Sequence, residues 1–450
     1  MSTALITLAA GKGTRMKSDL PKVLHRIAGA PMLWHALRAG AALDPERSVV
    51  VAGHGFDEVA ASVREYDPEM QVVEQAEQLG TGHAVKVALP ALEGFDGDVV
   101  VLYGDTPFIS SDTLEALRAA RATHDVVVLG FEAADPGRYG RLVLDGDELV
   151  KIVEFKDATD AERQITLCNS GVIAVDAALL TRMLAKLGND NASGEYYLTD
   201  VPDLARAEGY KATVVRCPEA ETLGVNSRSD LAFAEAAFQA AARAELLDLG
   251  VTMQAPETVH LAWDTVIGRD AEIEPNVVFA PGVTVESGAR IRAFSHLEGC
   301  HVSRGAIVGP YARLRPGAEL AEDVHVGNFV EVKNAVLHEG VKANHLTYIG
   351  DAEIGQKTNI GAGTITCNYD GVFKHKTTIG KNAFIGSDTM LVAPVTIGDG
   401  AMTGSGSTIT SDVPAGALAI ARGKQETKPD LATKLMNMLR AKKAKQKTNA

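Results

Sequence analysis

The chain has 450 residues, 46% of them hydrophobic, and a formal net charge of −14, so we expect a globular protein of two or three domains. The negative charge argues against nucleic-acid binding, because duplex affinity depends on cationic contacts with phosphate. No apolar run approaches the roughly 20 residues of a membrane span, and the four cysteines are too scattered for a zinc site or a secreted disulfide scaffold, which predicts a cytoplasmic protein with reduced thiols.

The first third of the chain alternates apolar strands with amphipathic helices. We expect strands at residues 4–10 and 48–53, a helix at 32–42, and a buried strand at 99–102. This alternation is typical of an α/β sheet covered by helices.

A glycine-rich loop, Leu-Ala-Ala-Gly-Lys-Gly-Thr-Arg-Met at residues 8–16, follows the first strand. Small residues such as Gly11 and Gly13 let backbone amides approach a phosphate, while Lys12, Arg15 and Lys22 supply positive charge. The loop matches neither the Walker A motif nor the dinucleotide fingerprint. An ordinary tight turn remains the alternative interpretation.

Asp105 follows the buried strand 99–102, at the end of the strand where ligands bind in open α/β sheets. A carboxylate there is a natural ligand for Mg²⁺, which prefers oxygen donors and bridges substrate phosphates. The alternative is a cap on the following helix. Other polar residues and glycines that follow turns in this half are uninformative one by one: Gln75, Gly80, Thr81, Gly140, Glu154, Asn169 and Asn226.

The alanine-rich segment 230–249 is helical by pattern, with Phe233, Ala237, Ala241 and Leu246 on one side. It lies between the α/β pattern and a different repeat, so we interpret it as a connecting helix. The expected domains are therefore 1–228, a linker helix at 229–250, and 251–450.

From about residue 266 to 413 the chain repeats a six-residue unit, as in Ile267, Ile273, Phe279, Val285 and Ile291. A helix would space apolar residues three and four apart, and an ordinary strand every second residue. A period of six fits short strands joined by tight turns, with three hexads closing one coil of a parallel β-helix and coils stacked about 4.8 Å apart. The alternative is a collection of loops. Because a solenoid cannot cover its own flank, we expect association.

The repeat is interrupted at residues 299–304 and 367–378, and we expect both interruptions to form loops on one face. The second, which contains Cys-Asn-Tyr-Asp-Gly-Val-Phe-Lys-His-Lys, is expected to reach a ligand or a neighbouring subunit. The last residues, 439–450, carry Arg440, Lys442, Lys443, Lys445 and Lys447. We expect a solvated, disordered terminus there, with a basic interaction arm as the alternative.

The loop at 8–16, followed by Pro21-Lys22, resembles the signature of sugar-nucleotide pyrophosphorylases. Combined with hexapeptide repeats that contain His345-Leu346-Thr347-Tyr348, residues 359–364 and residues 367–371, it makes nearly the whole chain similar to one bacterial family. This is the family of bifunctional N-acetylglucosamine-1-phosphate uridylyltransferases and glucosamine-1-phosphate acetyltransferases. The linker helix and the basic tail lie outside the resemblance.

The resemblance implies an α/β nucleotidyltransferase domain with a Rossmann-like mixed sheet, a linker helix, and a left-handed parallel β-helix that assembles into a homotrimer. It implies that acetyl-CoA acetylates glucosamine 1-phosphate, and that UMP is then transferred from UTP to N-acetylglucosamine 1-phosphate, with release of pyrophosphate and with Mg²⁺ as cofactor.

The resemblance also assigns residues to each site. The uridine nucleotide would be held by Leu8, Ala10, Gly11, Lys22, Gln75, Gly80 and Thr81. The sugar-phosphate site would be lined by Tyr103, Asp105, Gly140, Glu154 and Asn169. Mg²⁺ would be held by Asp105 and Asn226. The acetyl acceptor would be held by Arg315, Lys333, Tyr348 and Asn359, and acetyl-CoA by Asn368, Tyr369, Ser387, Ser405 and Arg422. Ser405 stands where some relatives carry alanine, so its contact would run through the backbone.

The two reactions need different groups. Nucleotidyl transfer to an ionised phosphate needs positioning and charge neutralisation, which Lys22, Arg15 and Mg²⁺ would supply without a general base. Acetyl transfer needs the amine to lose a proton, and His345 is the expected base because imidazole titrates in the working range. A lone histidine in a repeat is otherwise usually structural. Glu331 is a further candidate for orienting the amine.

Two competing interpretations remain. A nucleotidyltransferase whose β-helix serves only assembly would lack His345 with its cationic neighbours Arg315 and Lys333. A sugar-nucleotide-binding scaffold without activity would lack Asp105 or Lys22.

Overall fold

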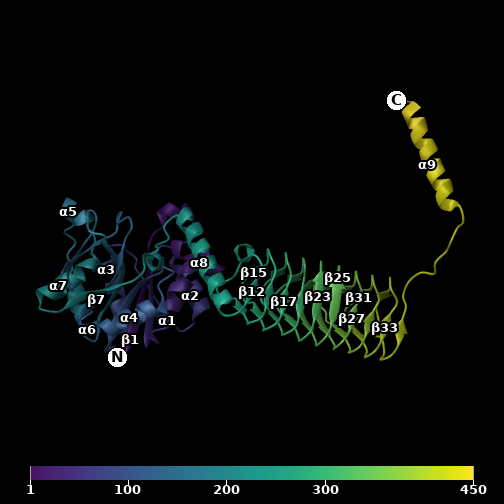
Figure 1. Cartoon of the computed structure of the whole chain (residues 1–450), viewed down its shortest axis with the longest axis horizontal. Coiled ribbons are helices and arrows are strands. Elements are labelled where there is room, and N and C mark those ends of the chain that lie inside the picture. The colour runs from purple at the N-terminus through teal and green to yellow at the C-terminus, as the bar shows by residue number, and fades with distance from the viewer. Residues whose placement is uncertain (1, 449–450) are drawn as a thin grey trace. The chain divides into compact units, whose positions relative to one another are not determined.

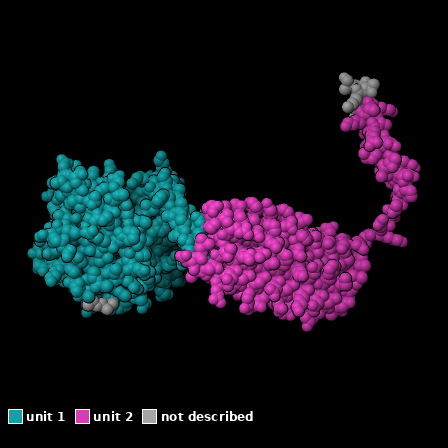
Figure 2. Space-filling view, in the orientation of Figure 1, with its two compact units in different colours: residues 1–246, 260–265 teal, residues 247–259, 266–450 magenta. Residues whose placement is uncertain are grey.

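Two compact units divide the chain in this computed structural model, which describes residues 2–448 (Figure 2). Unit 1 comprises the residues up to Leu246 together with His260–Thr265, and unit 2 comprises Leu247–Val259 and the residues from Val266 onward. Among the helices that the structure describes, none has both the length and the apolarity needed to cross a bilayer.

A nine-stranded mixed sheet organises unit 1, in the order β5-β4-β1-β6-β10-β7-β11-β9-β8 (Figure 1). Its strands are β1 (Thr3–Ala9), β4 (Arg47–Ala52), β5 (Gln71–Glu74), β6 (Asp98–Tyr103), β7 (Val126–Glu132), β8 (Arg141–Asp145), β9 (Glu148–Val153), β10 (Leu167–Asp176) and β11 (Ala212–Arg216). β5, β4, β1 and β6 run parallel, and β10 is antiparallel to β6 and β7. The predicted mixed α/β sheet is confirmed, with the three expected strands present as β1, β4 and β6.

Helices cover this sheet. They are α1 (Met32–Ala41), α2 (Phe56–Tyr66), α3 (Thr81–Ala88), α4 (Ser111–Ala120), α5 (Asp160–Arg163), α6 (Ala177–Leu184) and α7 (Val201–Ala207). A further helix, α8 (Arg228–Asp248), packs through Ala234 on the separate cluster of Ile27, Ala28 and Met32. Alternate residues of β1 enter different cores: Ile6 belongs to the cluster of Val85 and Leu180, and Leu5 to the cluster of Leu114. Burial on both faces explains why every residue of β1 is buried and why apolar residues do not alternate with exposed polar ones.

Unit 2 is a left-handed parallel β-helix (Figure 1). One ladder contains β12 (Thr252–Met253), β14 (Glu272–Ile273), β17 (Arg290–Ile291), β20 (Ile307–Val308), β23 (His325–Asn328), β25 (Lys342–His345), β27 (Asn359–Ile360), β30 (Phe384–Ile385), β33 (Met402–Thr403) and β35 (Leu418–Ala419). A second contains β13 (Val266–Ile267), β16 (Thr284–Val285), β19 (Cys300–Val302), β22 (Ala318–Leu320), β24 (Glu331–Leu337), β26 (Tyr348–Ile354), β29 (Thr377–Ile379) and β32 (Val395–Ile397).

The third ladder shares β24 and β26 and adds β15 (Val278–Phe279), β18 (His296–Leu297), β21 (Arg313–Leu314), β28 (Ile365–Cys367), β31 (Met390–Val392) and β34 (Thr408–Ile409). Ile273 pairs with Ile291, a separation of 291 − 273 = 18 residues, which equals three hexads for each coil. The aliphatic residues of the hexads are buried, as the period of six predicted.

The predicted loop at residues 299–304 is wrong. β19 occupies this segment and pairs with both β16 and β22. Val285 pairs with Val302, so this coil is one residue shorter than 18 (302 − 285 = 17). The shortening falls at a corner where Gly299 has φ +50° and a Cβ would lie 3.1 Å from Pro316 Cα. Glycine therefore accommodates the missing residue without opening a loop.

The second interruption does form a loop, between the end of β28 at Cys367 and the start of β29 at Thr377. Tyr369 and Lys374 form an isolated antiparallel bridge within it, and Tyr369, Val372 and Phe373 are exposed.

The predicted disordered terminus is wrong for the described residues, because α9 extends over Leu431–Thr448. Its alanine, leucine, methionine, lysine and arginine residues all have high helix propensity. The side chain of Lys447 and residues 449–450 lie outside the described parts.

Candidate functional site

A pocket of about 320 Å³ lies at the carboxyl ends of β1 and β6. It is lined by Leu8, Ala9, Ala10, Gly11, Lys22, Val23, Gln75, Gln78, Gly80, Thr81, Ala84, Tyr103, Asp105 and Glu195. All seven residues expected to contact a nucleotide line it, together with Tyr103 and Asp105. The structure thus gathers residues from five separate stretches of the chain at the edge where parallel strands end.

Lys22 is the central cation of this pocket. It begins a short 3₁₀ helix, η2 (Lys22–Leu24), behind the glycine-rich loop. Its Nζ donates to Asp105 Oδ2 and, at 3.1 Å, to Asn226 Oδ1. The Lys22 and Asp105 side chains are only 12% and 20% exposed. The two residues predicted to hold a metal therefore point their oxygens at one shared positive charge.

Two glutamines tie the walls of the pocket together. Gln75 is buried and its Nε2 donates to Gly80 O at 3.1 Å, while Gln78 Nε2 donates to Ala10 O at 2.6 Å. The sequence reasoning missed Gln78, although its place between Gln75 and Gly80 was a signal. It also missed Glu195, which reaches the pocket because Tyr196 O accepts a hydrogen bond from Gly82 N at 2.8 Å. No local pattern could have indicated Glu195.

Gly140, Glu154 and Asn169 form a second group. Asn169 N donates to Gly140 O at 2.9 Å, and a Cβ on Gly140 would lie 3.6 Å from Glu154 Oε1. Burial raises the pKa of the Glu154 carboxyl, although a hydrogen bond from Thr199 Oγ1 at 3.1 Å lowers it in part.

Tyr103 lies between this group and the pocket. Burial, and then the charges of Glu154 and Asp105, raise the pKa of its phenol. Gly171, at φ +94°, packs so tightly on the Tyr103 ring that a Cβ would lie 2.7 Å from it. By contrast, Arg15 lies exposed on η1 (Thr14–Met16) and is not among the residues lining the pocket.

In unit 2, His345 ends β25 directly above Asn328 of β23. His345 Nδ1 and Asn328 Oδ1 are 2.9 Å apart. Because the carboxamide oxygen can only accept, Nδ1 carries the proton and Nε2 is left with its lone pair. Asn328 was missed from the sequence, because it becomes a neighbour of His345 only through the pairing of successive coils.

Charged residues lie on the coils next to the one that carries His345. Arg315 Nη1 donates to Glu331 Oε1 at 2.8 Å, and Glu331 pairs in register with Tyr348. Lys333, two residues further along β24, pairs with Gly350. Asn359 lies on β27, the next strand of the ladder that contains β25.

Asn368 anchors the start of the exposed loop at 368–376. Its Nδ2 donates to Asp351 and, at 3.4 Å, to Tyr348 Oη. Asn334 Nδ2 donates to the other Asp351 oxygen at 2.6 Å. Partial burial would raise the pKa of Asp351, but the hydrogen bonds from Asn334 and Asn368, with the charge of Lys333, hold it below its ordinary value of 3.8. Asp351 was also missed from the sequence.

The remaining predicted contacts occupy the last coils. Gly406 N donates to Ser387 O at 2.8 Å, and Arg422 Nη1 donates to Ser405 O at 2.5 Å. Ser405 thus offers its backbone to Arg422. Tyr369 lies on the exposed loop, with Lys374 Nζ 4.2 Å from its ring centroid.

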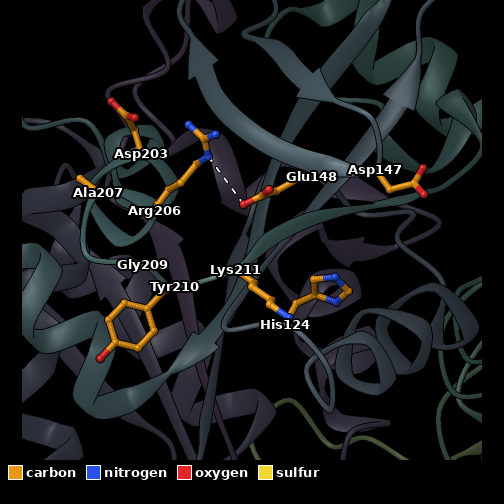
Figure 3. Close-up of a pocket in the computed structure, with 9 residues that line it drawn as sticks. All are labelled: His124, Asp147, Glu148, Asp203, Arg206, Ala207, Gly209, Tyr210 and Lys211. Atoms are coloured by element: carbon orange, nitrogen blue, oxygen red, sulfur yellow. Dashed lines mark ion pairs between the residues drawn. The ribbon is translucent and has the colours of Figure 1, made fainter.

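A larger open hollow of about 690 Å³ lies elsewhere on unit 1 (Figure 3). It is lined by His124, Asp147, Glu148, Asp203, Arg206, Ala207, Gly209, Tyr210 and Lys211. Arg206 and Glu148 pair across it at 3.6 Å. None of the predicted residues lines this hollow, so size alone does not identify the site.

The sequence is also similar to known protein families. Residues 5–166 match the MobA-like NTP transferase domain, and residues 264–299 and 376–411 match the bacterial transferase hexapeptide family of six repeats. The chain is 72% identical to the bifunctional protein GlmU of Ruegeria sp. (strain TM1040) over 99% of both chains. It is 71% identical to that of Ruegeria pomeroyi, over 99% of both, and 66% identical to that of Jannaschia sp. (strain CCS1), over 99% of this chain and 98% of the relative. The chain therefore belongs to the family of bifunctional GlmU proteins.

Proposed function

We propose that the chain is a bifunctional enzyme of UDP-N-acetylglucosamine synthesis. It acetylates glucosamine 1-phosphate with acetyl-CoA in unit 2 and transfers UMP from UTP to N-acetylglucosamine 1-phosphate in unit 1. The observation that carries the proposal is that each unit has its own polar site: the pocket around Lys22 and Asp105, and the His345–Asn328 pair beside Arg315 and Glu331.

In uridylyl transfer, an oxygen of the sugar phosphate attacks the α-phosphorus of UTP, and the bond to pyrophosphate breaks. The nucleophile is already ionised, so the site supplies position and positive charge rather than a base. Lys22 lines the pocket together with Ala10 and Gly11 of the glycine-rich loop, and its ammonium can neutralise phosphate charge there. Arg15, on the same loop, is the proposed contact for the departing pyrophosphate.

The residues present fit a divalent cation, for which we propose Mg²⁺. Asp105 and Asn226 offer carboxylate and amide oxygens, the hard donors that Mg²⁺ prefers, and both already hold a cation in the form of the Lys22 ammonium. When bound, the ion supplies further neutralisation of phosphate charge.

In acetyl transfer, His345 Nε2 takes a proton from the ammonium group of glucosamine 1-phosphate. The free amine then attacks the thioester carbonyl, the carbon–sulfur bond breaks, and the coenzyme A thiolate takes up a proton. Asn328 fixes the tautomer that this role requires. Arg315 and Lys333 are the proposed contacts for the substrate phosphate, and Asn368, Tyr369, Ser387, Ser405 and Arg422 for acetyl-CoA.

We further propose a homotrimer that acts in the cytoplasm. A stripe of exposed apolar side chains, the corner stripe, runs along one corner of the β-helix through Phe294, Tyr311, Phe329 and Leu346. The rings stack at centroid separations of 4.9 Å for Phe294–Tyr311 and 5.4 Å for Tyr311–Phe329. Contiguous apolar surface of this kind is typical of interaction sites, and the stripe reaches Leu346, the neighbour of His345.

One experiment tests both activities. The chain is incubated with glucosamine 1-phosphate, acetyl-CoA, UTP and Mg²⁺, and free thiol and pyrophosphate are measured separately. We expect thiol from unit 2 first and pyrophosphate afterwards. Pyrophosphate from supplied N-acetylglucosamine 1-phosphate without any thiol release would instead support a single-activity nucleotidyltransferase, and the absence of both products would support a binding scaffold.

A further inference from the structure

The Lys22 ammonium already occupies the donor pair that is proposed to hold the metal. Its Nζ donates to Asp105 Oδ2 and to Asn226 Oδ1 at 3.1 Å. A metal ion bound to the same oxygens would lie a few ångströms from the ammonium. Like charges at that range repel strongly in a partly buried site. The ammonium and the metal ion therefore compete for the same pair of oxygens.

The two segments that carry these oxygens are held together by contacts of their own. Asp105 O accepts a hydrogen bond from Val225 N at 3.0 Å, which ties the two ligand-bearing segments together. Asn226 N donates to Asp230 Oδ2 at 3.0 Å, and Asn226 Nδ2 lies 3.4 Å from Gly224 O, so that Oδ1 faces Lys22. These contacts do not involve Lys22, so the two segments would stay together if the ammonium left.

Lys22 is fixed at its backbone and free to move at its tip. Gly13, at φ +56°, packs so closely that a Cβ would lie 2.6 Å from Lys22 Cβ. Beyond that point the side chain is a flexible stem that ends in a point charge. It also lines the pocket beside Ala10 and Gly11, where a phosphate would offer the ammonium a second anionic partner.

We propose that Lys22 closes the metal site in the free enzyme and that the phosphates of the nucleotide open it by drawing the ammonium away from Asp105. This inference rests on the proposed uridylyl transfer and adds an order to it: the divalent cation enters with the nucleotide or after it. By linkage, a nucleotide that displaces Lys22 raises the affinity for the cation, and the cation raises the affinity for the nucleotide by the same factor.

The test measures binding of Mn²⁺ alone to the full-length chain without nucleotide, followed by the electron paramagnetic resonance signal of the free ion. Lys22→Met removes the ammonium and keeps the stem. We expect it to bind Mn²⁺ at least about tenfold more tightly than the parent chain, within the usual range of coupling between two sites. Lys22→Arg keeps the charge and should bind Mn²⁺ as weakly as the parent.

Matched variants separate this effect from a general change in charge. Lys12→Met removes a cation of the glycine-rich loop that has no part in the donor pair, and it should leave Mn²⁺ binding at the parent level. Adding Asp105→Asn to Lys22→Met should abolish the gain. Circular dichroism establishes that each variant is folded, and Lys22→Gln repeats the test with a polar side chain if Lys22→Met is not.

Equal Mn²⁺ affinity in the parent and Lys22→Met chains, or an equal gain in Lys12→Met, overturns the inference. That result is distinct from failure of the proposed function, which is judged by pyrophosphate release from the parent chain. A parent chain that releases pyrophosphate and binds free Mn²⁺ as tightly as Lys22→Met overturns only the closed metal site.

Discussion

At the scale of single residues, His345 and Asp105 have different polar partners and different proposed tasks. Asn328 holds the Nδ1 edge of His345 and leaves Nε2 available to accept a proton. Asp105 instead presents a carboxylate oxygen to a cation. One side chain is arranged for proton transfer and the other for charge neutralisation, so each can be removed to test one activity.

Replacing His345 by alanine should slow acetyl transfer by about 10²- to 10⁴-fold, the usual contribution of a positioned general base. Arg315 and Lys333 would still contact the substrate phosphate, so the KM for glucosamine 1-phosphate should change little while kcat falls. Steady-state thiol release measures both constants. Acetyl transfer at the parent rate would remove His345 from the mechanism and direct attention to Glu331.

Replacing Asp105 by alanine should abolish pyrophosphate release and leave thiol release close to the parent rate. The carboxylate belongs to unit 1, whereas His345 belongs to unit 2. Both products are measured in the same reaction mixture. If both activities fell together while circular dichroism showed an intact fold, two independent sites would be the wrong description.

At the scale of elements, the β-helix depends on one buried aliphatic residue in each hexad. Leu297 of β18 is 0% exposed and lies between Phe279 and Leu314 in its ladder. Leu297→Ala should lower the free energy of unfolding by about 2–5 kcal/mol, because the cavity is lined by rigid neighbouring coils. Urea denaturation measures the change.

Val278 provides the control, because it lies on the neighbouring strand β15 and is 37% exposed. Val278→Ala should change the free energy of unfolding by no more than about 0.5 kcal/mol. Similar losses for both variants would mean that the inward residue of the hexad is not the one that stabilises the coil.

The exposed loop after β28 depends on Asp351. Asp351→Ala leaves the buried Asn368 amide without its carboxylate, which costs about 1–3 kcal/mol. The KM for acetyl-CoA should therefore rise about tenfold, which corresponds to about 1.4 kcal/mol. Glu339→Ala is the control, since Glu339 is an exposed carboxylate whose side chain contacts Gln356 and no residue of the loop. An unchanged KM in Asp351→Ala would show that the loop does not contribute to coenzyme binding.

The pH dependence of the contact between Asp351 and Asn368 follows from the direction of the Asp351 pKa shift. The pKa of Asp351 is lower in the folded protein than its ordinary value of 3.8, so the stabilisation is fully present above that value and is lost as the pH falls through the lower folded pKa. The KM for acetyl-CoA should therefore show no pH dependence arising from Asp351 between about pH 5 and 8.

At the scale of the whole molecule, the corner stripe predicts assembly. Tyr311→Glu places a charge in the middle of the stacked rings and should convert the proposed trimer to monomers, seen as a threefold fall in mass by light scattering. Thiol release should fall with it, because the acetyl site borders the stripe, while pyrophosphate release continues. Tyr311→Phe keeps the stacking and should remain a trimer. A fully active monomeric parent chain would contradict the proposal.

Periodic features of the chain could be predicted from sequence. A core residue repeated every six positions demands a coil of three short strands wherever it occurs, and an apolar run flanked by turn residues demands a buried strand. These rules act over a few residues, so they located β1, β4, β6, α8 and the β-helix. Many candidate site residues were assigned by resemblance to a family. Such a resemblance gives the role of each residue but does not explain how folding brings the residues together.

The tertiary structure alone decided which distant residues meet. Asn226 reaches Lys22, Glu195 enters the nucleotide pocket, and Asn328 lies beneath His345, because strand order and coil register set those distances. It also decided that the interruption at Gly299 shortens a corner instead of opening a loop. The sequence by itself determined the repeating elements, since their causes are local. The contacts that form the sites depend on long-range packing, which no local pattern records.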